Sequence, residues 1–289
     1  MKDVMYFAPA GIDEALALLA EHKGKATVLA GGTDLVPKVN YYELKPDILI
    51  YTGGMGSAYI KEEDGKLVIG AGTTWTELTV NSLVAEKASI LVEAAKQGGC
   101  VATRNAGTIG GNLVNASPAA DLATPLLVMD AELLLKSTNG ERVVPINEFF
   151  KGPGETVLKP DELLVEIHIP PVRGKTAFLK LGRRRAMTLS VVNVAVRLEM
   201  AKKNPGTFRT CNEARIALGA MAPTPLRCIK SEKMLKGKML DKASMDECAA
   251  EAIAETSPVD DQRATAWYRK KAGAALVVRA LSQAAGIKS

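Results

Sequence analysis

Hydrophobic residues recur along the chain in two periods, one typical of helices and the other typical of strands. Residues 12–21 carry leucines among alanines at helical spacing, which predicts an amphipathic helix. Short apolar runs at residues 26–30, 47–51 and 66–70 predict strands. The last run follows a turn at Asp64-Gly65, so we expect it to be half of a hairpin. The start of the chain therefore mixes helix and short strands.

The next segment is predicted to be mainly helical. Thr74 and Glu77 have the spacing of a capping box, so a helix should begin there. Residues 90–97 form a further amphipathic stretch, which the pair Gly98-Gly99 should end.

One more helix and two strands are expected before the first strong break. Ser117-Pro118 fits an N-cap followed by proline at the first helical position, which predicts a helix through Leu122 to about Met129. Apolar runs at 131–137 and 163–169 predict strands.

A proline-rich stretch at residues 170–174 is the strongest linker signal of the chain. Beyond it the pattern predicts strands and then helices, at 176–181, 190–200, 213–221, 230–235, 245–255 and 264–285. We therefore predict an α+β domain over residues 1–172, with subdomains of about 1–55 and 56–172. A smaller α+β domain should occupy residues 173–289.

Composition narrows the class of protein. The 289 residues are 47% hydrophobic and 24% charged, as in ordinary globular proteins. Aromatic residues make up only 4%, which weighs against a nucleic-acid surface built on base stacking. No stretch is long and apolar enough to span a bilayer, and the first residues do not resemble a signal peptide. We expect a cytoplasmic protein.

Cysteine and histidine offer little chemistry. The four cysteines are far apart with no C-x-x-C pair, namely Cys100, Cys211, Cys228 and Cys248. This chain alone is therefore not expected to hold zinc or an iron–sulfur cluster, and its thiols should be free. His22 and His168 are expected at a helix end and on the polar face of a strand. No catalytic side chain is predicted, which favours a cofactor with its own reactivity.

Two glycine-containing stretches suggest where such a cofactor binds. Gly31-Gly32-Thr33-Asp34 follows a predicted strand directly, and paired glycines allow close approach to a phosphate group. Thr108 through Asn112, which we expect to form a loop, repeat this chemistry with two glycines, a hydroxyl and an amide. Neither matches a Rossmann or Walker motif, and either stretch alone could be a structural turn. Two of them in one predicted domain indicate a ligand that contains a pyrophosphate.

These stretches belong to a longer set of motifs that resembles a known family. The set comprises residues 7–9, 29–35, 104–113, 117–121, 150–154, 161–164 and 222–227. Together they resemble the FAD-binding medium subunits of molybdenum hydroxylases over almost the whole chain. Gly32 is followed by Thr33-Asp34 and not by His-Ser, so the xanthine dehydrogenase type is the better match. The resemblance implies a two-part FAD-binding domain of the vanillyl-alcohol oxidase (PCMH) type and a smaller C-terminal domain of the carbon monoxide dehydrogenase flavoprotein type.

The resemblance also implies which residues hold FAD without a covalent bond. The expected set is Leu29, Ala30, Gly31, Gly32, Thr33, Asp34, Leu35, Val36, Thr108, Ile109, Gly110, Gly111, Asn112, Asp121, Leu164 and Lys180. Both glycine stretches should hold the pyrophosphate, and Asp121 should meet ribityl or ribose hydroxyls. Lys180 should lie near the pyrimidine end of the flavin, unless it is a solvated strand lysine. Trp75 and Trp267 are expected to pack and not to stack on the flavin.

By the same resemblance, this chain passes electrons and does not bind the substrate itself. A large subunit with a molybdenum cofactor and a small subunit with [2Fe–2S] clusters are the expected partners, and NAD⁺ or another molecule is the acceptor. A free-standing FAD oxidase or dehydrogenase is the alternative, and a protein that lost its flavin is a third reading. Arg183-Arg184-Arg185 is either a solvated turn or a contact to a phosphate or partner.

Overall fold

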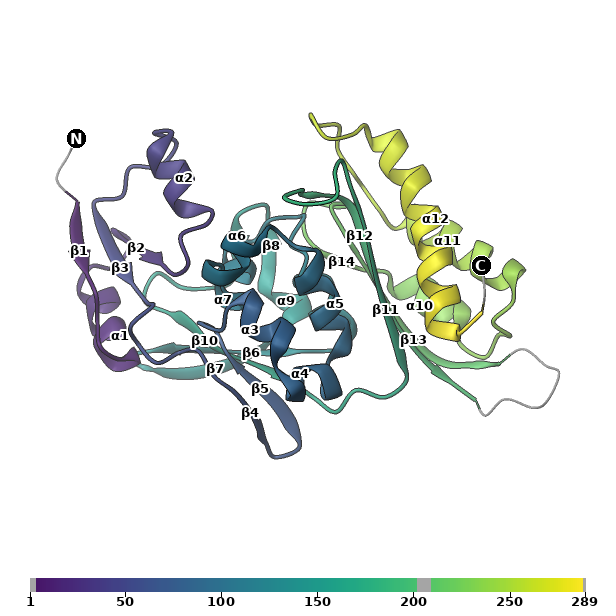
Figure 1. Cartoon of the computed structure of the whole chain (residues 1–289), viewed down its shortest axis with the longest axis horizontal. Coiled ribbons are helices and arrows are strands. Elements are labelled where there is room, and N and C mark those ends of the chain that lie inside the picture. The colour runs from purple at the N-terminus through teal and green to yellow at the C-terminus, as the bar shows by residue number, and fades with distance from the viewer. Residues whose placement is uncertain (1–3, 202–208, 288–289) are drawn as a thin grey trace.

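The computed structural model describes residues 4–201 and 209–287. Three bodies follow one another along its longest axis (Figure 1). The first is a small sheet with two helices, the second is a larger sheet under a layer of short helices, and the third is a sheet covered by three helices. The predicted α+β class is thus confirmed.

The first body is a parallel three-stranded sheet in the order β1-β3-β2. Its elements are β1 (Met5–Phe7), α1 (Ile12–Glu21), β2 (Ala26–Leu29), α2 (Leu35–Asn40) and β3 (Ile48–Tyr51). Leu16 and Leu19 of α1 pack on Ile50 and reach Leu163 and Val165 of the second body. This apolar cluster fixes the small sheet against the larger one.

The second body is built on an antiparallel sheet in the order β4-β5-β10-β6-β7. Its strands are β4 (Ile60–Glu63), β5 (Lys66–Gly70), β6 (Glu132–Ser137), β7 (Gly140–Pro145) and β10 (Leu163–Ile169). The predicted hairpin is confirmed, since β4 pairs with β5 across Asp64 and Gly65, both at positive φ. β8 (Phe150–Gly152) and β9 (Glu155–Thr156) form a separate pair.

Short helices pack on one face of this sheet. They are α3 (Trp75–Val80), α4 (Ser82–Lys87), α5 (Ser89–Gln97), α6 (Val101–Ala106), α7 (Ile109–Val114), α8 (Ala123–Val128) and α9 (Ile146–Phe149). Ile69 and Ile167 of the sheet share one core with Leu91 and Leu126 of the helices. The predicted capping box is present, because Thr74 Oγ1 accepts from the Glu77 amide at 3.2 Å and the Glu77 carboxylate accepts from the Thr74 amide at 2.7 Å.

The third body is an antiparallel sheet in the order β11-β12-β13-β14. Its elements are β11 (Lys175–Gly182), β12 (Ser190–Met200), β13 (Cys211–Gly219), β14 (Leu226–Arg227), α10 (Ile229–Leu235), α11 (Lys242–Ala254) and α12 (Ala266–Ala285). Val194 and Val196 pack under these helices, whereas Ala195 faces the core of the second body. β12 is therefore buried on both faces, which explains its nearly continuous apolar sequence.

The predicted start of one helix is wrong. The helix expected from Ser117 begins only at Ala123, and residues 117–122 form turns. The Ser117 hydroxyl and carbonyl accept from the amides of Ala119 and Ala120, which closes a turn and does not start a helix. Asp121 thus precedes the helix and does not lie within it.

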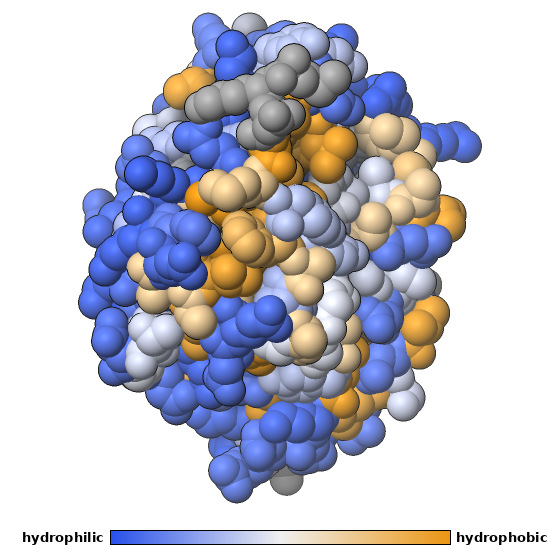
Figure 2. Space-filling model, turned by 90° about the vertical axis from the view of Figure 1, so that its left-hand side faces the viewer, coloured by the Kyte–Doolittle hydropathy of each residue, from blue (hydrophilic) through white to orange (hydrophobic). Residues whose placement is uncertain are grey.

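The end of the molecule formed by the first body is largely hydrophilic, with hydrophobic side chains gathered near the middle of that face (Figure 2). Met5 and Tyr6 of the edge strand β1 are exposed, and Tyr6 stacks on Tyr51. No helix of the described residues is long and apolar enough to cross a membrane.

Candidate functional site

A cavity of about 840 Å³ lies where the three bodies meet. One wall comes from residues 28–38 of the first body, and the opposite wall comes from residues 99–121 and 153–165 of the second. Met187, Thr188 and Leu189, between β11 and β12, line one more part of it. A volume of this size is typical of sites for cofactors and other organic ligands.

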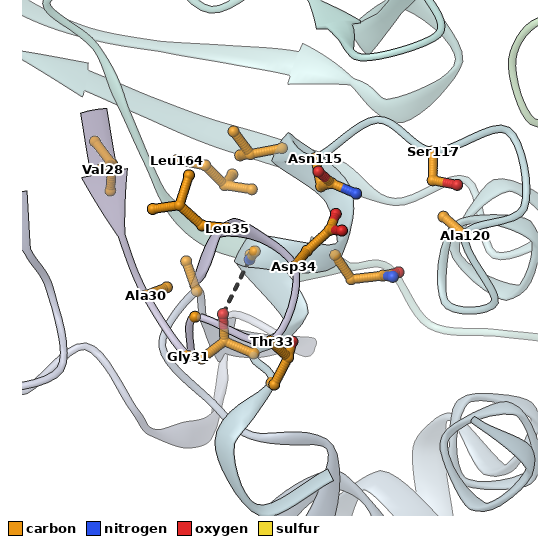
Figure 3. Close-up of a pocket in the computed structure, with 18 of the residues that line it drawn as sticks. Val28, Ala30, Gly31, Thr33, Asp34, Leu35, Asn115, Ser117, Ala120 and Leu164 are labelled. Atoms are coloured by element: carbon orange, nitrogen blue, oxygen red, sulfur yellow. Dashed lines mark hydrogen bonds between the residues drawn. The ribbon is translucent and has the colours of Figure 1, made fainter. Parts of the chain in front are cut away.

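The first glycine stretch joins β2 to α2 and forms the wall drawn in Figure 3. Gly32 has φ +67°, which a side chain would strain. At Gly31 an added Cβ would lie 1.8 Å from the carbonyl oxygen of Ala106, so only glycine lets the first body approach the second this closely. Both glycines are therefore required by the backbone itself.

This stretch leaves a row of unbonded backbone amides beside the cavity. Within the described residues, the amides of Gly31 to Leu35 have no hydrogen-bond acceptor, and the first bonded one is Val36, which donates to Gly32 at 3.0 Å. Figure 3 shows Gly31, Thr33 and Asp34 on this loop, with Asn115 facing them and Leu35 and Leu164 nearby. Consecutive free amides form a binding site for an anionic oxygen group such as a phosphate.

The second stretch differs from the prediction, because Gly110, Gly111 and Asn112 belong to the first turn of α7 and not to a loop. Thr108 caps this helix by accepting from Gly111 at 2.9 Å. The Gly110 amide donates to Ala71, also at 2.9 Å. These amides are already bonded within the protein, so this stretch does not provide a second row of free donors.

What the second stretch offers the cavity is a side chain. Asn112 lines the cavity, and its Oδ1 is buried without a hydrogen-bond partner. A buried carbonyl oxygen without a donor costs free energy that a bound hydroxyl or amine can recover. Gly110 allows α7 to pack tightly, because an added Cβ would lie 2.7 Å from Ala71. Ile109 is fully buried in the core and does not line the cavity.

Asp121 and Lys180 form a buried ion pair at the edge of the cavity. Lys180 Nζ lies 2.5 Å from Asp121 Oδ2 and also donates to the Gln97 carbonyl. Asp121 Oδ1 accepts from Ser190 and Asn193. Burial raises the pKa of the Asp121 carboxyl, and the Lys180 ammonium and the two other donors oppose that rise.

The pair changes both sequence-based expectations for these residues. The side chain of Lys180 is 3% exposed, so it is not a solvated strand lysine, but it does not line the cavity. Asp121 does line the cavity, yet its carboxylate is already bonded to three side chains.

The structure gathers most of the predicted residues around one cavity. Those that line it are Ala30, Gly31, Gly32, Thr33, Asp34, Leu35, Thr108, Gly110, Gly111, Asn112, Asp121 and Leu164. Those that do not are Leu29, Val36, Ile109 and Lys180. Leu29 pairs with Tyr51 in the small sheet, and Val36 is 45% exposed.

Several lining residues were not predicted. Lys38 and Asn115 face each other across the cavity, and Arg104 contributes a second cation. Lys38 lies one helical turn beyond Asp34, so a prediction of helix α2 would have placed its ammonium next to the first glycine stretch. Trp75 packs against Gly98 and also lines the cavity. The expectation that Trp267 packs is wrong, because it is 65% exposed with the Lys271 ammonium over its ring.

The arginine cluster lies in the connection between β11 and β12. Arg183 donates to the Gln262 carbonyl at 2.8 Å, and Arg184 donates to the Met187 carbonyl through Nε, also at 2.8 Å. Arg184 therefore holds backbone that borders the cavity, whereas Arg183 ties this connection to the residues before α12.

The described residues contain no group of His, Cys, Asp and Glu side chains able to hold a metal ion. All four cysteines are free thiols, as predicted. A large cavity where three bodies meet, with free amides and an unpaired buried carbonyl, has the features of a site for an organic cofactor that carries phosphate. The class defined by fold and site is therefore a cofactor-binding protein.

Comparison with known proteins identifies the family. The family model described as "FAD binding domain in molybdopterin dehydrogenase" matches residues 2–172, and that of the "CO dehydrogenase flavoprotein C-terminal domain" matches residues 177–284. The chain is 32% identical to the xanthine dehydrogenase FAD-binding subunit of Escherichia coli O157:H7 over 269 residues, covering 91% of this chain and 90% of the relative. It is 34% identical to the carbon monoxide dehydrogenase medium chain of Hydrogenophaga pseudoflava, covering 96% of each.

Comparison with solved structures leads to the same family. A chain of reconstituted CO dehydrogenase from Oligotropha carboxidovorans has a TM-score of 0.93 at 32% identity, covering 99% of both chains. A chain of quinoline 2-oxidoreductase from Pseudomonas putida 86 has a TM-score of 0.91 at 28% identity, covering 98% of this chain and 97% of that one. The chain therefore belongs to the family of FAD-binding medium subunits of molybdenum hydroxylases, which are oxidoreductases. The expected two-part FAD-binding domain followed by a smaller C-terminal domain is confirmed.

Proposed function

We propose that this chain is the electron-transfer subunit of a xanthine dehydrogenase-like molybdenum hydroxylase. In the proposed complex, a small partner subunit supplies electrons from [2Fe–2S] clusters, and a large partner subunit carries the molybdenum cofactor. NAD⁺ or another acceptor then takes the electrons from FAD. The observation that carries the proposal is the row of free amides from Gly31 to Leu35, which borders the cavity and lies inside the segment matched by the FAD-binding family.

We place the FAD pyrophosphate on these amides, because they are consecutive backbone donors without an acceptor in the chain. Asn112 would accept a hydrogen bond from the cofactor at its unpaired Oδ1. Leu164, 8% exposed, would give apolar contact. Asp121 and Lys180 would act as a pair at the edge of the site, with Asp121 facing the cofactor.

Bound FAD supplies the redox chemistry, because a flavin can accept electrons one at a time and deliver two together. The residues of this chain hold the cofactor, limit the access of water and set the local charge. We assign no side chain as an acid, base or nucleophile.

Two further features complete the proposal. We take the domain boundary to lie at residues 172 and 173, between the two family matches and before β11. We place the protein in the cytoplasm, since all four of its thiols are free and the cytosol keeps thiols reduced.

Purification of the complex from its native host tests the proposal. A tag on this chain should bring down two further subunits, and denaturation should release FAD together with iron and molybdenum. NAD⁺ and artificial dyes are then compared as acceptors in the intact complex. FAD without partners or metals would support a free-standing flavoenzyme instead, and a chain that cannot be loaded with FAD would contradict the cofactor site.

A further inference from the structure

Lys38 reaches across the cavity from one body to another. It lies on α2 of the first body, and its Nζ donates to Asn115 Oδ1 beyond the end of α7, at 3.3 Å. The same ammonium lies 3.6 Å from Asp34 Oδ2. Both contacts are long, and the side chain is 44% exposed. The ammonium is therefore held loosely, and it can change partners at little cost.

The other charges around the cavity are already committed. The charged lining residues are Asp34, Lys38, Arg104, Asp121 and Glu162. Asp121 is paired with Lys180, and Glu162 accepts two bonds from Arg142 at 2.8 Å.

Arg104, the other lining cation, donates to the Gly98 carbonyl at 3.0 Å, so its guanidinium is held against the backbone. Among the described residues that line the cavity, Lys38 is thus the cation that no short hydrogen bond holds in place.

A diphosphate next to Gly31–Leu35 needs such a cation. The free amides offer dipoles, but they do not neutralise its double negative charge. Asp34 adds a third negative charge on the same loop, with its side chain 52% exposed. Lys38 follows Asp34 by one helical turn, on the same side of α2, and its ammonium lies 3.6 Å from this carboxylate.

We infer that Lys38 is a binding residue for the FAD diphosphate and that it exchanges Asn115 for a phosphate oxygen when the cofactor binds. This inference rests on the proposed FAD site. In the exchange, the ammonium keeps its proximity to Asp34 and shields that carboxylate from the phosphates. Asn115 Oδ1 is the partner of the Lys38 ammonium in the cofactor-free chain.

Flavin titration of the full-length, flavin-free chain tests this role. The Kd for FAD is measured by quenching of flavin fluorescence at several salt concentrations, with circular dichroism melts as a check of folding. Lys38→Met should raise the Kd about tenfold, which corresponds to about 1.4 kcal/mol. It should also flatten the dependence of log Kd on log salt, because one charge contact is lost. Lys38→Arg should bind within about threefold of wild type, since a cation is retained.

Two matched variants separate this role from others. Lys45→Met removes an exposed lysine of the same body that does not line the cavity, so the Kd should not change. Asn115→Ala should change the Kd less than Lys38→Met does, because it removes the resting partner of the ammonium and no charge.

Three results would overturn the inference. The first is an unchanged Kd for FAD and an unchanged salt dependence in Lys38→Met. The second is an equal loss of FAD affinity in Lys38→Met and Lys38→Arg. The third is a loss of FAD affinity in Asn115→Ala as large as in Lys38→Met. Failure of the wild-type chain to bind FAD would instead contradict the proposed function itself.

Discussion

Lys180 Nζ and Asp121 Oδ2 lie 2.5 Å apart, and the two residues come from opposite sides of the proline-rich linker. With both side chains less than a tenth exposed, each charge depends on the other. We predict that Asp121→Ala lowers the free energy of unfolding by about 3 kcal/mol, because it leaves a buried ammonium without its partner. Urea unfolding monitored by circular dichroism measures this loss.

The double variant Asp121→Ala with Lys180→Met should recover most of that stability, because both buried charges are then gone. Lys23→Met provides the control, since Lys23 also pairs with an aspartate, Asp161, but is 58% exposed and should contribute less than about 1 kcal/mol. If the double variant lost as much stability as Asp121→Ala and Lys180→Met lose when added together, the broken ion pair would not be the cause of the destabilisation.

Gly31→Ala should prevent FAD retention. The new Cβ would lie 1.8 Å from the Ala106 carbonyl, which forces the first body away from the second and widens the site. We expect the Kd for FAD to rise at least tenfold. Gly11→Ala is the control, because no atom lies within 4 Å of its added Cβ. Equal FAD content after purification of the two variants would refute the close approach as a requirement for binding.

Asp130 anchors the second body to the third and should make their association sensitive to acid. Its carboxylate meets Arg227 at 2.9 Å, Arg197 at 3.1 Å and Arg215 at 3.2 Å. Burial alone would raise the pKa of Asp130, but the three arginines outweigh it and hold the pKa below its usual range.

Because the folded pKa is lowered, this stabilisation is present above the unfolded pKa of about 4 and is lost as pH falls through the folded value. Asp130→Asn should therefore cost about 1 kcal/mol at pH 7, after allowance for solvent screening, and progressively less below pH 4. Asparagine also tolerates the φ of +52° at this position. Thermal melts of the wild type and the variant from pH 3 to pH 7 measure the difference in stability. A difference that stayed constant with pH would exclude the ion pairs as its cause.

Cys100 should be the reactive thiol of the folded chain. Hydrogen bonds from Thr103 lower the pKa of Cys100, whereas burial raises the pKa of Cys211 to about 11 and that of Cys248 to about 12. Burial raises the pKa of Cys228 as well. A thiol reagent should modify one residue rapidly in the native protein and four after denaturation.

Bound FAD should slow this reaction, because the neighbours Gly99 and Thr103 line the cavity. Peptide mapping identifies the labelled residue. Rapid labelling of any of the three buried cysteines would contradict this prediction.

The sequence was most informative where structure depends on neighbouring residues. The Thr74–Glu77 cap and the positive φ of Gly32 follow from local chemistry, and both were predictable. The second glycine stretch was expected to be a loop, and glycine is indeed a poor helix former. The Thr108 cap and the Ala71 carbonyl, which comes from a distant part of the chain, outweigh that preference.

The partners of site residues were harder to predict. Asp121 was assigned to cofactor hydroxyls, but Lys180, Ser190 and Asn193 bind it once the third body packs against the second. Lys38 was missed because its importance depends on the position of Asn115 across the cavity. Such pairings require the tertiary arrangement, which hydrophobic periodicity does not specify.

The contact between Gly31 and Ala106 means that the cofactor site exists only while the first two sheets stay together. Any ligand that binds the closed arrangement and not the unfolded chain stabilises it by mass action, by about 2.7 kcal/mol at a hundredfold excess over its Kd. Flavin supply would then control how long this subunit survives proteolysis before assembly. A cell short of riboflavin would then lose the subunit itself, and not only its bound flavin.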